Sequence, residues 1–377
     1  MSSLYIHVPW CRSKCGYCDF FSLVPGAGEL DSYVAALLRH LELIARSGAD
    51  LSPVETLFFG GGTPSLLDAS QVGRILEAVR QGMGMAVDAE ISLEANPGTL
   101  SADSLAGYRR AGVNRLSLGI QSLSDARLRR LGRGHDRRAA LRAVELARAA
   151  GFANLSLDFI FAQPGQDLAQ LQEEAERYLA LAPEHISLYG LSLEEGTPLY
   201  AAMESGAFEL PSDEEYAAQY LLLHRLLGAA GYRHYEISNF ARPGRRCRHN
   251  LGYWRRRACL AIGAGAHSFL DSGWGLRRAC PPDVAAYGTR LARGRDPSEE
   301  IETFDRRGAM AETLYLGLRT DEGVCEKIFA RRFGSTIEEA WPGAAQALSP
   351  WLDRGGGRWR FGVEGWLIYD RLISRFL

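Results

Sequence analysis

The sequence is poor in lysine and in long apolar runs. Lys14 and Lys327 are the only lysines, and the formal net charge of the 377 residues is −2. This balance argues against a protein that binds nucleic acid by neutralising many phosphates. No segment approaches the roughly 20 apolar residues of a membrane-spanning helix, and no charged head followed by an apolar run marks a secretory signal. We therefore expect a cytoplasmic protein without a transmembrane segment.

The sequence also lacks the cysteine pattern of a disulfide framework. Its seven cysteines are an odd number, and a chain of this length can bury enough core to need no covalent cross-links. Cys247, Cys259, Cys280 and Cys325 are scattered singly, and isolated cysteines usually pack as small apolar residues. The other three are close together near the start of the chain and require a separate explanation.

Cys11, Cys15 and Cys18 follow a strand-like opening with the spacing C-x3-C-x2-C. A cubane iron–sulfur cluster normally takes four thiolates, so three of them leave one iron open to another ligand. A structural zinc site that uses His7 as a fourth ligand is the alternative. However, no second C-x2-C pair occurs downstream, as such zinc sites usually require. The spacing therefore favours a [4Fe-4S] cluster with one open iron.

The first 195 residues alternate short β-branched apolar runs with longer amphipathic stretches rich in Ala, Leu and Arg. This alternation is typical of repeated strand–helix units and a parallel sheet. Right-handed crossovers would wind the units into a partial barrel. The clearest expected helices are Asp31–Arg46 and Asp136–Ala150. The expected strands are Leu4–Val8, Thr56–Phe59, Glu90–Glu94, Arg115–Ile120, Leu155–Ile160 and His185–Leu191.

We expect two domains, an α/β partial (β/α)6 barrel over residues 1–200 and a smaller α+β domain over residues 201–377. The tail from residue 358 onward resembles a winged-helix element, with a short two-stranded turn before a terminal helix. Because the net charge is near zero and no basic recognition helix is present, we interpret this tail as a packing element. The other elements expected in the second domain are helices at 212–230, 309–318 and 323–333 and a strand at 235–237.

The unusual residues of the first domain follow the expected strands. In barrels of this kind, active residues gather at the carboxyl ends of the strands. The glycine run at residues 60–62 would let a ligand lie against bare backbone, although such a run is often only a tight turn. Glu94 and Gln121 end apolar strands, where a polar side chain is costly unless it is paired or binds a ligand. Asp158 interrupts a buried run, and a structural pair with Arg133 is the alternative to a ligand-binding role.

Taken together, these residues resemble the radical S-adenosylmethionine (radical SAM) superfamily, in its HemN/HemW branch of coproporphyrinogen III dehydrogenases and haem chaperones. The resemblance covers nearly the whole chain. It rests on the cysteine motif, Gly60–Pro64, Leu93–Pro97, Leu116–Gln121, Leu157–Ile160 and the motif His249-Asn250-x2-Tyr253-Trp254.

The resemblance implies two cofactors in the barrel. Cys11, Cys15 and Cys18 would hold three irons of a [4Fe-4S] cluster, and the amino and carboxylate groups of S-adenosylmethionine would chelate the fourth iron. No residue is assigned a catalytic role. The positions that match S-adenosylmethionine contacts in the family are Tyr5, Gly61, Gly62, Thr63, Glu94, Gln121, Arg133 and Asp158.

Two departures favour the haem-chaperone group of this branch. Asp19-Phe20 follows Cys18, where the dehydrogenases carry a further cysteine, and three residues precede Leu4, where the dehydrogenases carry an extension. A third sign is a match to a motif linked with haem in the chaperones. An imidazole would suit the iron, aromatic rings the porphyrin face, and flanking arginines the propionates. A hydrogen-bonded histidine in a domain-packing loop is the alternative. The residues of this motif are His249, Asn250, Tyr253 and Trp254.

The resemblance implies a chaperone that binds haem and delivers it to acceptor haemoproteins. The rival function is oxygen-independent decarboxylation of coproporphyrinogen III, which we do not expect. A radical enzyme with another substrate stays open, because the barrel would serve it equally well. The expected partners are haem and haem-accepting proteins, without nucleic acid. Peripheral membrane contact through an acceptor and a homodimer are both left open.

Overall fold

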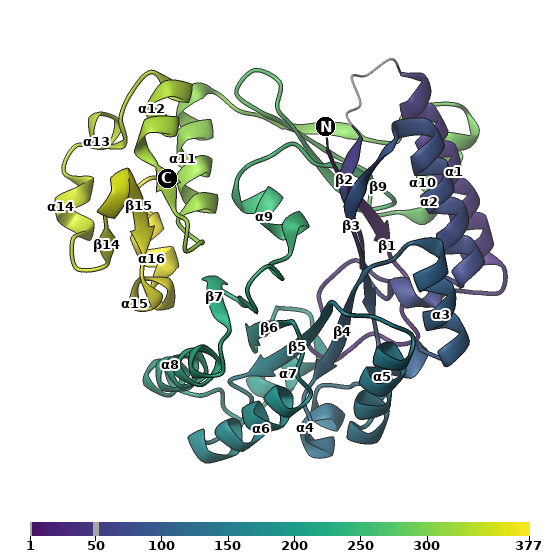
Figure 1. Cartoon of the computed structure of the whole chain (residues 1–377), viewed down its shortest axis with the longest axis horizontal. Coiled ribbons are helices and arrows are strands. Elements are labelled where there is room, and N and C mark those ends of the chain that lie inside the picture. The colour runs from purple at the N-terminus through teal and green to yellow at the C-terminus, as the bar shows by residue number, and fades with distance from the viewer. Residues whose placement is uncertain (1, 48–52) are drawn as a thin grey trace.

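The computed structural model describes residues 2–47 and 53–377, and its main element is a mixed sheet of nine strands. The strand order is β7-β8-β6-β5-β4-β3-β2-β1-β9. The six central strands run parallel in chain order and form the partial barrel seen in Figure 1. The six expected strands are confirmed as β1 (Ser3–Val8), β2 (Val54–Gly61), β3 (Met85–Ala95), β4 (Arg115–Gln121), β5 (Leu155–Phe161) and β6 (His185–Gly190).

Amphipathic helices connect the parallel strands and cover the outer face of the sheet (Figure 1). Side-chain caps fix several helix starts. Asp68 and Gln71 form a reciprocal capping box before one helix, and Ser212 and Glu215 do so before another. The helices are α1 (Glu29–Arg46), α2 (Ala69–Met83), α3 (Ala102–Ala111), α4 (Asp125–Arg130), α5 (Arg137–Ala149), α6 (Leu168–Ala180), α7 (Pro198–Glu204) and α8 (Asp213–Ala229), with 3-10 turns at Pro64–Leu66 and Pro97–Thr99.

Alternation along the strands separates an apolar outer face from a polar inner face. In β1, Leu4, Ile6 and Val8 are fully buried in the main hydrophobic core with α1 and α2. Tyr5 and His7 point to the opposite face, because successive side chains of a strand alternate. The inner face repeats this polarity in the neighbouring strands, with Thr56, Glu90, Ser92, Glu94, Arg115, Ser117, Ser156, Asp158, His185 and Ser187.

Three short strands from the second half of the chain extend the barrel sheet at both edges. β7 (Arg233–Glu236) and β8 (Asn239–Ala241) form a hairpin beside β6, and β9 (Leu260–Ile262) lies parallel to β1. The strand expected near residues 235–237 is β7. The sequence reasoning missed β8 and β9, which have only three residues each.

The rest of the second half forms two small sheets and further helices. One sheet contains β10 (His267–Leu270), β11 (Leu276–Ala279) and β12 (Glu299–Thr303). The other contains β13 (Val324–Cys325), β15 (Arg358–Phe361) and β14 (Leu352–Asp353), with a 3-10 turn at Gly355–Gly357. The helices are α9 (Arg248–Trp254), α10 (Val284–Ala292), α11 (Arg306–Gly317), α12 (Glu326–Phe333), α13 (Ile337–Ala340), α14 (Ala344–Leu348), α15 (Val363–Leu367) and α16 (Tyr369–Ile373).

The C-terminal tail is more elaborate than expected. The expected two-stranded turn is wrong, because the tail contains only β15, which pairs with β13 and β14 from before residue 358. The expected single helix is divided into α15 and α16 at Ile368. The tail packs with α11 and α12 in a second hydrophobic core between residues 309 and 376. The main core continues from the barrel as far as Leu291. The division at residue 200 therefore stays a prediction, and the buried residues themselves separate between 291 and 309.

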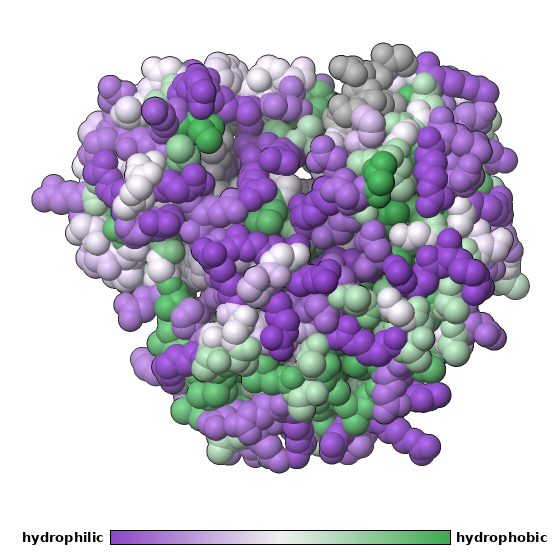
Figure 2. Space-filling view, viewed as in Figure 1, coloured by the Kyte–Doolittle hydropathy of each residue, from purple (hydrophilic) through white to green (hydrophobic). Residues whose placement is uncertain are grey.

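The surface in Figure 2 is a mixture of hydrophilic and hydrophobic residues, with hydrophilic residues covering most of the visible face. Within the described residues, no helix combines the length and the apolar character that crossing a bilayer requires.

Candidate functional site

A cavity of about 600 Å³ opens at the carboxyl ends of the parallel strands. We call it the rim cavity. It collects most of the predicted site residues from five strands and their following loops, as expected for an α/β barrel. The predicted residues that line it are Cys11, Cys15, Cys18, Gly61, Gly62, Thr63, Glu94, Gln121, Arg133 and Asp158.

Backbone hydrogen bonds hold the cysteine loop against the glycine run. The amide of Gly62 donates to the Val8 carbonyl at 2.9 Å, and the amide of Thr63 donates to the Trp10 carbonyl at 2.7 Å. A Cβ atom on Gly62 would lie 2.7 Å from the Trp10 oxygen and 3.0 Å from the Cys11 sulfur. Glycine is therefore required at this position because the chain leading into Cys11 passes too close for a side chain.

The three cysteines share one cavity and are all free thiols. Among the described residues, no three Cys, His, Asp or Glu side chains already form a metal-binding group. All three sulfurs have access to the same cavity. The donor set of three sulfurs from one loop is nevertheless what a cluster with one open iron needs.

Side-chain hydrogen bonds connect two of the cysteines through a short relay. The Thr63 hydroxyl donates to Cys11 Sγ at 3.4 Å, and the Asn96 amide donates to the Thr63 oxygen at 2.9 Å. The Arg133 guanidinium donates to Asn96 Oδ1 and to Cys15 Sγ, the latter at 3.3 Å. Hydrogen bonds to coordinating sulfurs are among the interactions that set the reduction potential of an iron–sulfur cluster. Arg133 therefore contacts the cysteine loop and forms no ion pair with Asp158.

Two carboxyl groups face the same cavity, and burial raises the pKa of each. Burial, together with the nearby Asp158, raises the pKa of Glu94 to about 8, although the Gly61 amide donates to Glu94 Oε2 at 3.3 Å. Burial also raises the pKa of Asp158 to about 6, against hydrogen bonds that include one from Ser117 at 3.1 Å. Such carboxyl groups can bind hydroxyl or amino groups of a ligand that displaces water.

Gln121 ends β4 in a left-handed conformation, with φ of 67°. This conformation is costly for a residue other than glycine and concentrates at ligand sites. The buried Gln121 Oε1 has no hydrogen-bond partner among the described residues. An unpartnered buried oxygen on a strained residue, lining the rim cavity, is typical of a position that binds a ligand.

Tyr5 belongs to an adjoining cavity, which also includes Gly61 and Glu94. Its hydroxyl is 3.2 Å from His7 Nδ1. Burial, with Glu94 nearby, raises the pKa of Tyr5. Tyr5 is therefore next to the predicted S-adenosylmethionine residues, although it does not line the rim cavity with them.

The predicted haem motif lies on α9, which packs against the inner face of the barrel sheet. His249 is 2% exposed, and its two ring nitrogens lie 2.9 Å from the Thr56 hydroxyl and 3.1 Å from the Tyr253 hydroxyl. Burial lowers the pKa of His249 to about 3. Binding of haem iron by His249 would require one of these hydrogen bonds to break and the buried ring to become accessible.

Trp254 of the motif and two flanking arginines, Arg246 and Arg255, make contacts within the protein. The half-buried Trp254 packs against Tyr235 and Leu251. Arg255 pairs with Glu322 at 2.7 Å, and Arg246 pairs with Asp321 at the same distance. Asn250 is half-buried on the same helix. Arg246 and Arg255 therefore connect the region around α9 to the C-terminal region.

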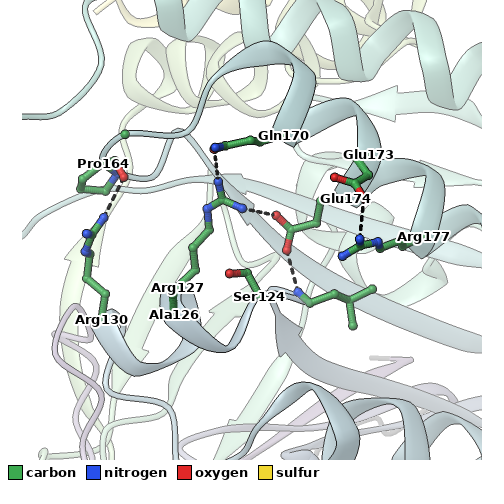
Figure 3. Close-up of a pocket in the computed structure, with 11 residues that line it drawn as sticks. Ser124, Ala126, Arg127, Arg130, Pro164, Gln170, Glu173, Glu174 and Arg177 are labelled. Carbon is green, nitrogen blue, oxygen red and sulfur yellow. Dashed lines mark hydrogen bonds and ion pairs between the residues drawn. The ribbon is translucent and has the colours of Figure 1, made fainter.

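Another cavity, on the outside of the barrel between α4 and α6, contains several arginines (Figure 3). Arg127 pairs with Glu174 at 3.1 Å, Arg177 pairs with Glu173 at 2.5 Å, and Arg130 donates to the Pro164 carbonyl at 2.7 Å. The Arg127–Glu174 ion pair joins α4 to α6, and Arg130 joins α4 to the loop before α6, so these two arginines serve packing between the two helices.

Sequence reasoning missed several residues of the rim cavity. Asn96 forms hydrogen bonds with both Thr63 and Arg133 and so connects the contacts to Cys11 and Cys15. Ser117 donates a hydrogen bond to Asp158. Asn96 lies two positions after Glu94 in a loop that the sequence had already marked, so its position after a strand was a usable signal. Ser117 gives no such signal, because a single serine in a strand is common. Tyr189 and Glu194 also line the cavity and were not assigned.

Comparison with known proteins identifies the class. Residues 5–178 match the family model of the radical SAM superfamily. Heme chaperone HemW of Escherichia coli is 44% identical over 100% of this chain and 98% of its own length. Heme chaperone HemW of Bacillus subtilis is 35% identical over 93% of this chain and 91% of its own length. The structure of coproporphyrinogen III oxidase HemN from E. coli superposes with a TM-score of 0.84, covering 99% of this chain and 89% of that chain at 21% identity.

These matches place the chain in the radical SAM superfamily. Within that superfamily it belongs to the family whose members carry the name HemW. The likeness to HemN confirms the partial barrel with a smaller C-terminal region and concerns the fold alone.

Proposed function

We propose that the protein binds haem and delivers it to acceptor haemoproteins, and that it carries a [4Fe-4S] cluster and S-adenosylmethionine in the rim cavity. The observation that carries the haem function is the 44% identity to a HemW chaperone across the whole chain. The relation to HemN, at 21% identity, supports only a shared fold. The expected location is the cytoplasm.

The radical SAM family implies the cluster and S-adenosylmethionine, and the residues present fit both groups. Cys11, Cys15 and Cys18 would bind three irons, and the Gly62 backbone leaves space beside Cys11. Glu94 and Asp158 would bind polar groups of S-adenosylmethionine. When bound, the cluster supplies a low-potential electron to the sulfonium group. The chain itself contributes the sulfur donors, their hydrogen bonds from Thr63 and Arg133, and a cavity that fixes the ligand.

The test compares the two functions directly. Protein reconstituted with iron and sulfide under anaerobic conditions is offered haem and coproporphyrinogen III in separate experiments. We expect stable haem binding, followed by transfer to an apo-haemoprotein, without formation of protoporphyrinogen. Turnover of coproporphyrinogen III would reject the chaperone function in favour of the dehydrogenase. Zinc, or the absence of inorganic sulfide, in the anaerobically reconstituted protein would reject the cluster.

A further inference from the structure

A second cavity of about 790 Å³ adjoins the rim cavity. Asp19, Phe20, Gly61 and Glu94 line both cavities, so a ligand in one would lie beside a ligand in the other. The remaining walls come from β1, β10, β11, α10 and β12. We call it the second cavity; its other residues are Tyr5, His7, Phe21, Gly265, His267, Ala279, Cys280, Pro281, Pro282, Arg290, Glu299 and Ile301.

His267 presents an accessible imidazole to this cavity. It is exposed at the start of β10, opposite Ala279 of β11, and its ring forms no hydrogen bond or ion pair with the described part of the chain. The cavity's other histidine, His7, is only 8% exposed, and its Nδ1 is 3.2 Å from the Tyr5 hydroxyl. His7 Nε2 is buried and has no hydrogen-bond partner among the described residues, so a ligand could reach it only if the surrounding residues moved. His267 is therefore the imidazole that can reach a ligand without rearrangement.

The walls near His267 combine exposed apolar side chains with one guanidinium group. Phe20 and Ile301 are 67% and 53% exposed, which is unusual for large apolar side chains that line one cavity. Arg290 supplies a guanidinium, at present paired with Glu299 at 2.5 Å. Both side chains of this pair are well exposed, so exchanging Glu299 for a ligand carboxylate costs little.

These features together match haem, which needs an axial ligand for its iron, apolar contacts for its ring and cations for its propionates. We propose that haem binds in the second cavity, with the imidazole of His267 as the axial ligand of its iron. This inference rests on the proposed haem function. It assigns the iron to His267 in place of His249. His249 is instead a buried part of the barrel interior, with both ring nitrogens in hydrogen bonds.

The test separates iron ligation from ring binding. Ferric haem and iron-free protoporphyrin IX are titrated into wild type and into His267→Ala, each with its cluster reconstituted. We expect His267→Ala to lower the affinity for ferric haem by about tenfold or more. Mutation of residues that only support a metal ligand already lowers metal affinity by about 10- to 100-fold. The absorption band of bound haem should also shift. Binding of protoporphyrin IX should change little, because it has no iron.

Two further variants define the site. Ala279→Phe, which fills the space opposite His267, should lower the affinity for both ferric haem and protoporphyrin IX. His224→Ala is the control, because His224 is a half-buried histidine on α8, and α8 packs at the β7 edge of the sheet, opposite the β9 edge. This control should bind both ligands like wild type, and all variants should retain iron and sulfide.

The outcomes distinguish the two proposals. If wild type binds no haem, the proposed function fails. If wild type binds haem and His267→Ala binds it equally well with an unchanged spectrum, the second cavity is not the iron site, whereas the haem function stands. If a cluster-containing His249→Gln variant no longer binds ferric haem while His267→Ala binds it normally, the iron ligand is His249 on α9.

Discussion

At the scale of single residues, the site depends on side chains that bind one another as well as a ligand. Thr63 is an example, because its hydroxyl donates to Cys11 Sγ while its oxygen accepts from Asn96. Asn96 in turn accepts from Arg133. The amide of Asn96 therefore stays paired only while Thr63 keeps its oxygen.

Thr63→Val should destabilise the protein even without a cluster. Valine keeps the shape of threonine but removes the acceptor for Nδ2 of the half-buried Asn96, which should cost up to about 1 kcal/mol. Urea denaturation of the metal-free protein measures this loss. Thr289→Val, on an exposed face of α10, is the matched control and should change the unfolding free energy by less than about 0.5 kcal/mol. Equal stability of the two variants would show that the relay does not form.

His249 should make the stability depend on pH. Burial lowers its folded-state pKa from 6.5 to about 3, so the unfolded chain binds a proton that the folded protein excludes. Above about pH 6.5, His249 is neutral in both states and does not lower the unfolding free energy. As pH falls from 6.5 toward 3, protonation of the unfolded chain lowers the unfolding free energy progressively. Between pH 6 and 4.5, wild type should lose up to about 1.4 kcal/mol per pH unit more than His249→Gln.

The measurement is urea denaturation of both proteins across that range. Other buried histidines, including His185 and His234, titrate in both proteins and cancel in the difference. The Glu90 side chain, which faces His249 from β3, accepts the His249 backbone amide and is also common to both. Parallel pH profiles would mean that the His249 ring is accessible to protons, as an open haem ligand would be.

At the scale of elements, local sequence patterns were sufficient to predict the central strands of the barrel. They were not sufficient to predict the short strands at the edges of its sheet. The central strands are runs of apolar residues between amphipathic helices, so each could be predicted from its own residues. β8 and β9 are three residues long, and their pairing with β6 and β1 depends on contacts between distant segments. The position of α9 against the inner face depends in the same way on Thr56 and Glu90, far away in sequence.

The candidate site shows the same division. The cysteines and the residues at strand ends were predictable because parallel strands bring their carboxyl ends to one rim. The sequence could not show that His249 would be buried or that His267 would be open, because burial depends on what packs against a residue. Figure 1 shows α9 between the barrel sheet and the C-terminal helices, a position that no local pattern indicates.

A buried ion-pair network joins the turn after α9 to α11 and β11. Glu312 pairs with both Arg256 and Arg277, and the side chains of Arg256 and Glu312 are 4% and 8% exposed. Glu312→Ala should lower the unfolding free energy by about 3–5 kcal/mol, because it leaves a buried guanidinium without its carboxylate. Glu302→Ala removes the exposed partner of Arg277 and should cost about 1 kcal/mol or less. Urea denaturation compares them, and similar losses would contradict this account of the network.

At the scale of the whole molecule, the barrel is completed by chain beyond residue 200. β9 covers the β1 edge, the β7–β8 hairpin covers the β6 edge, and α9 packs on the inner face. The C-terminal core is separate, but it is joined to the barrel by Arg246 and Arg255 through Asp321 and Glu322. The fully buried residues thus divide into a barrel core and a C-terminal core between residues 291 and 309, and Val363 and Leu367 of the tail also pack against the barrel core.

This organisation predicts different behaviour for two truncated chains. A fragment of residues 1–303 retains β7 to β12 and should keep the secondary structure of the barrel. A fragment of residues 1–200 loses β8 and β9 and exposes the edges of β6 and β1, and open edge strands pair with other chains and aggregate. Circular dichroism and analytical ultracentrifugation check both fragments. If the 1–200 fragment is monodisperse and unfolds cooperatively, the barrel half is self-sufficient and the domain boundary lies at residue 200, as the sequence alone suggested.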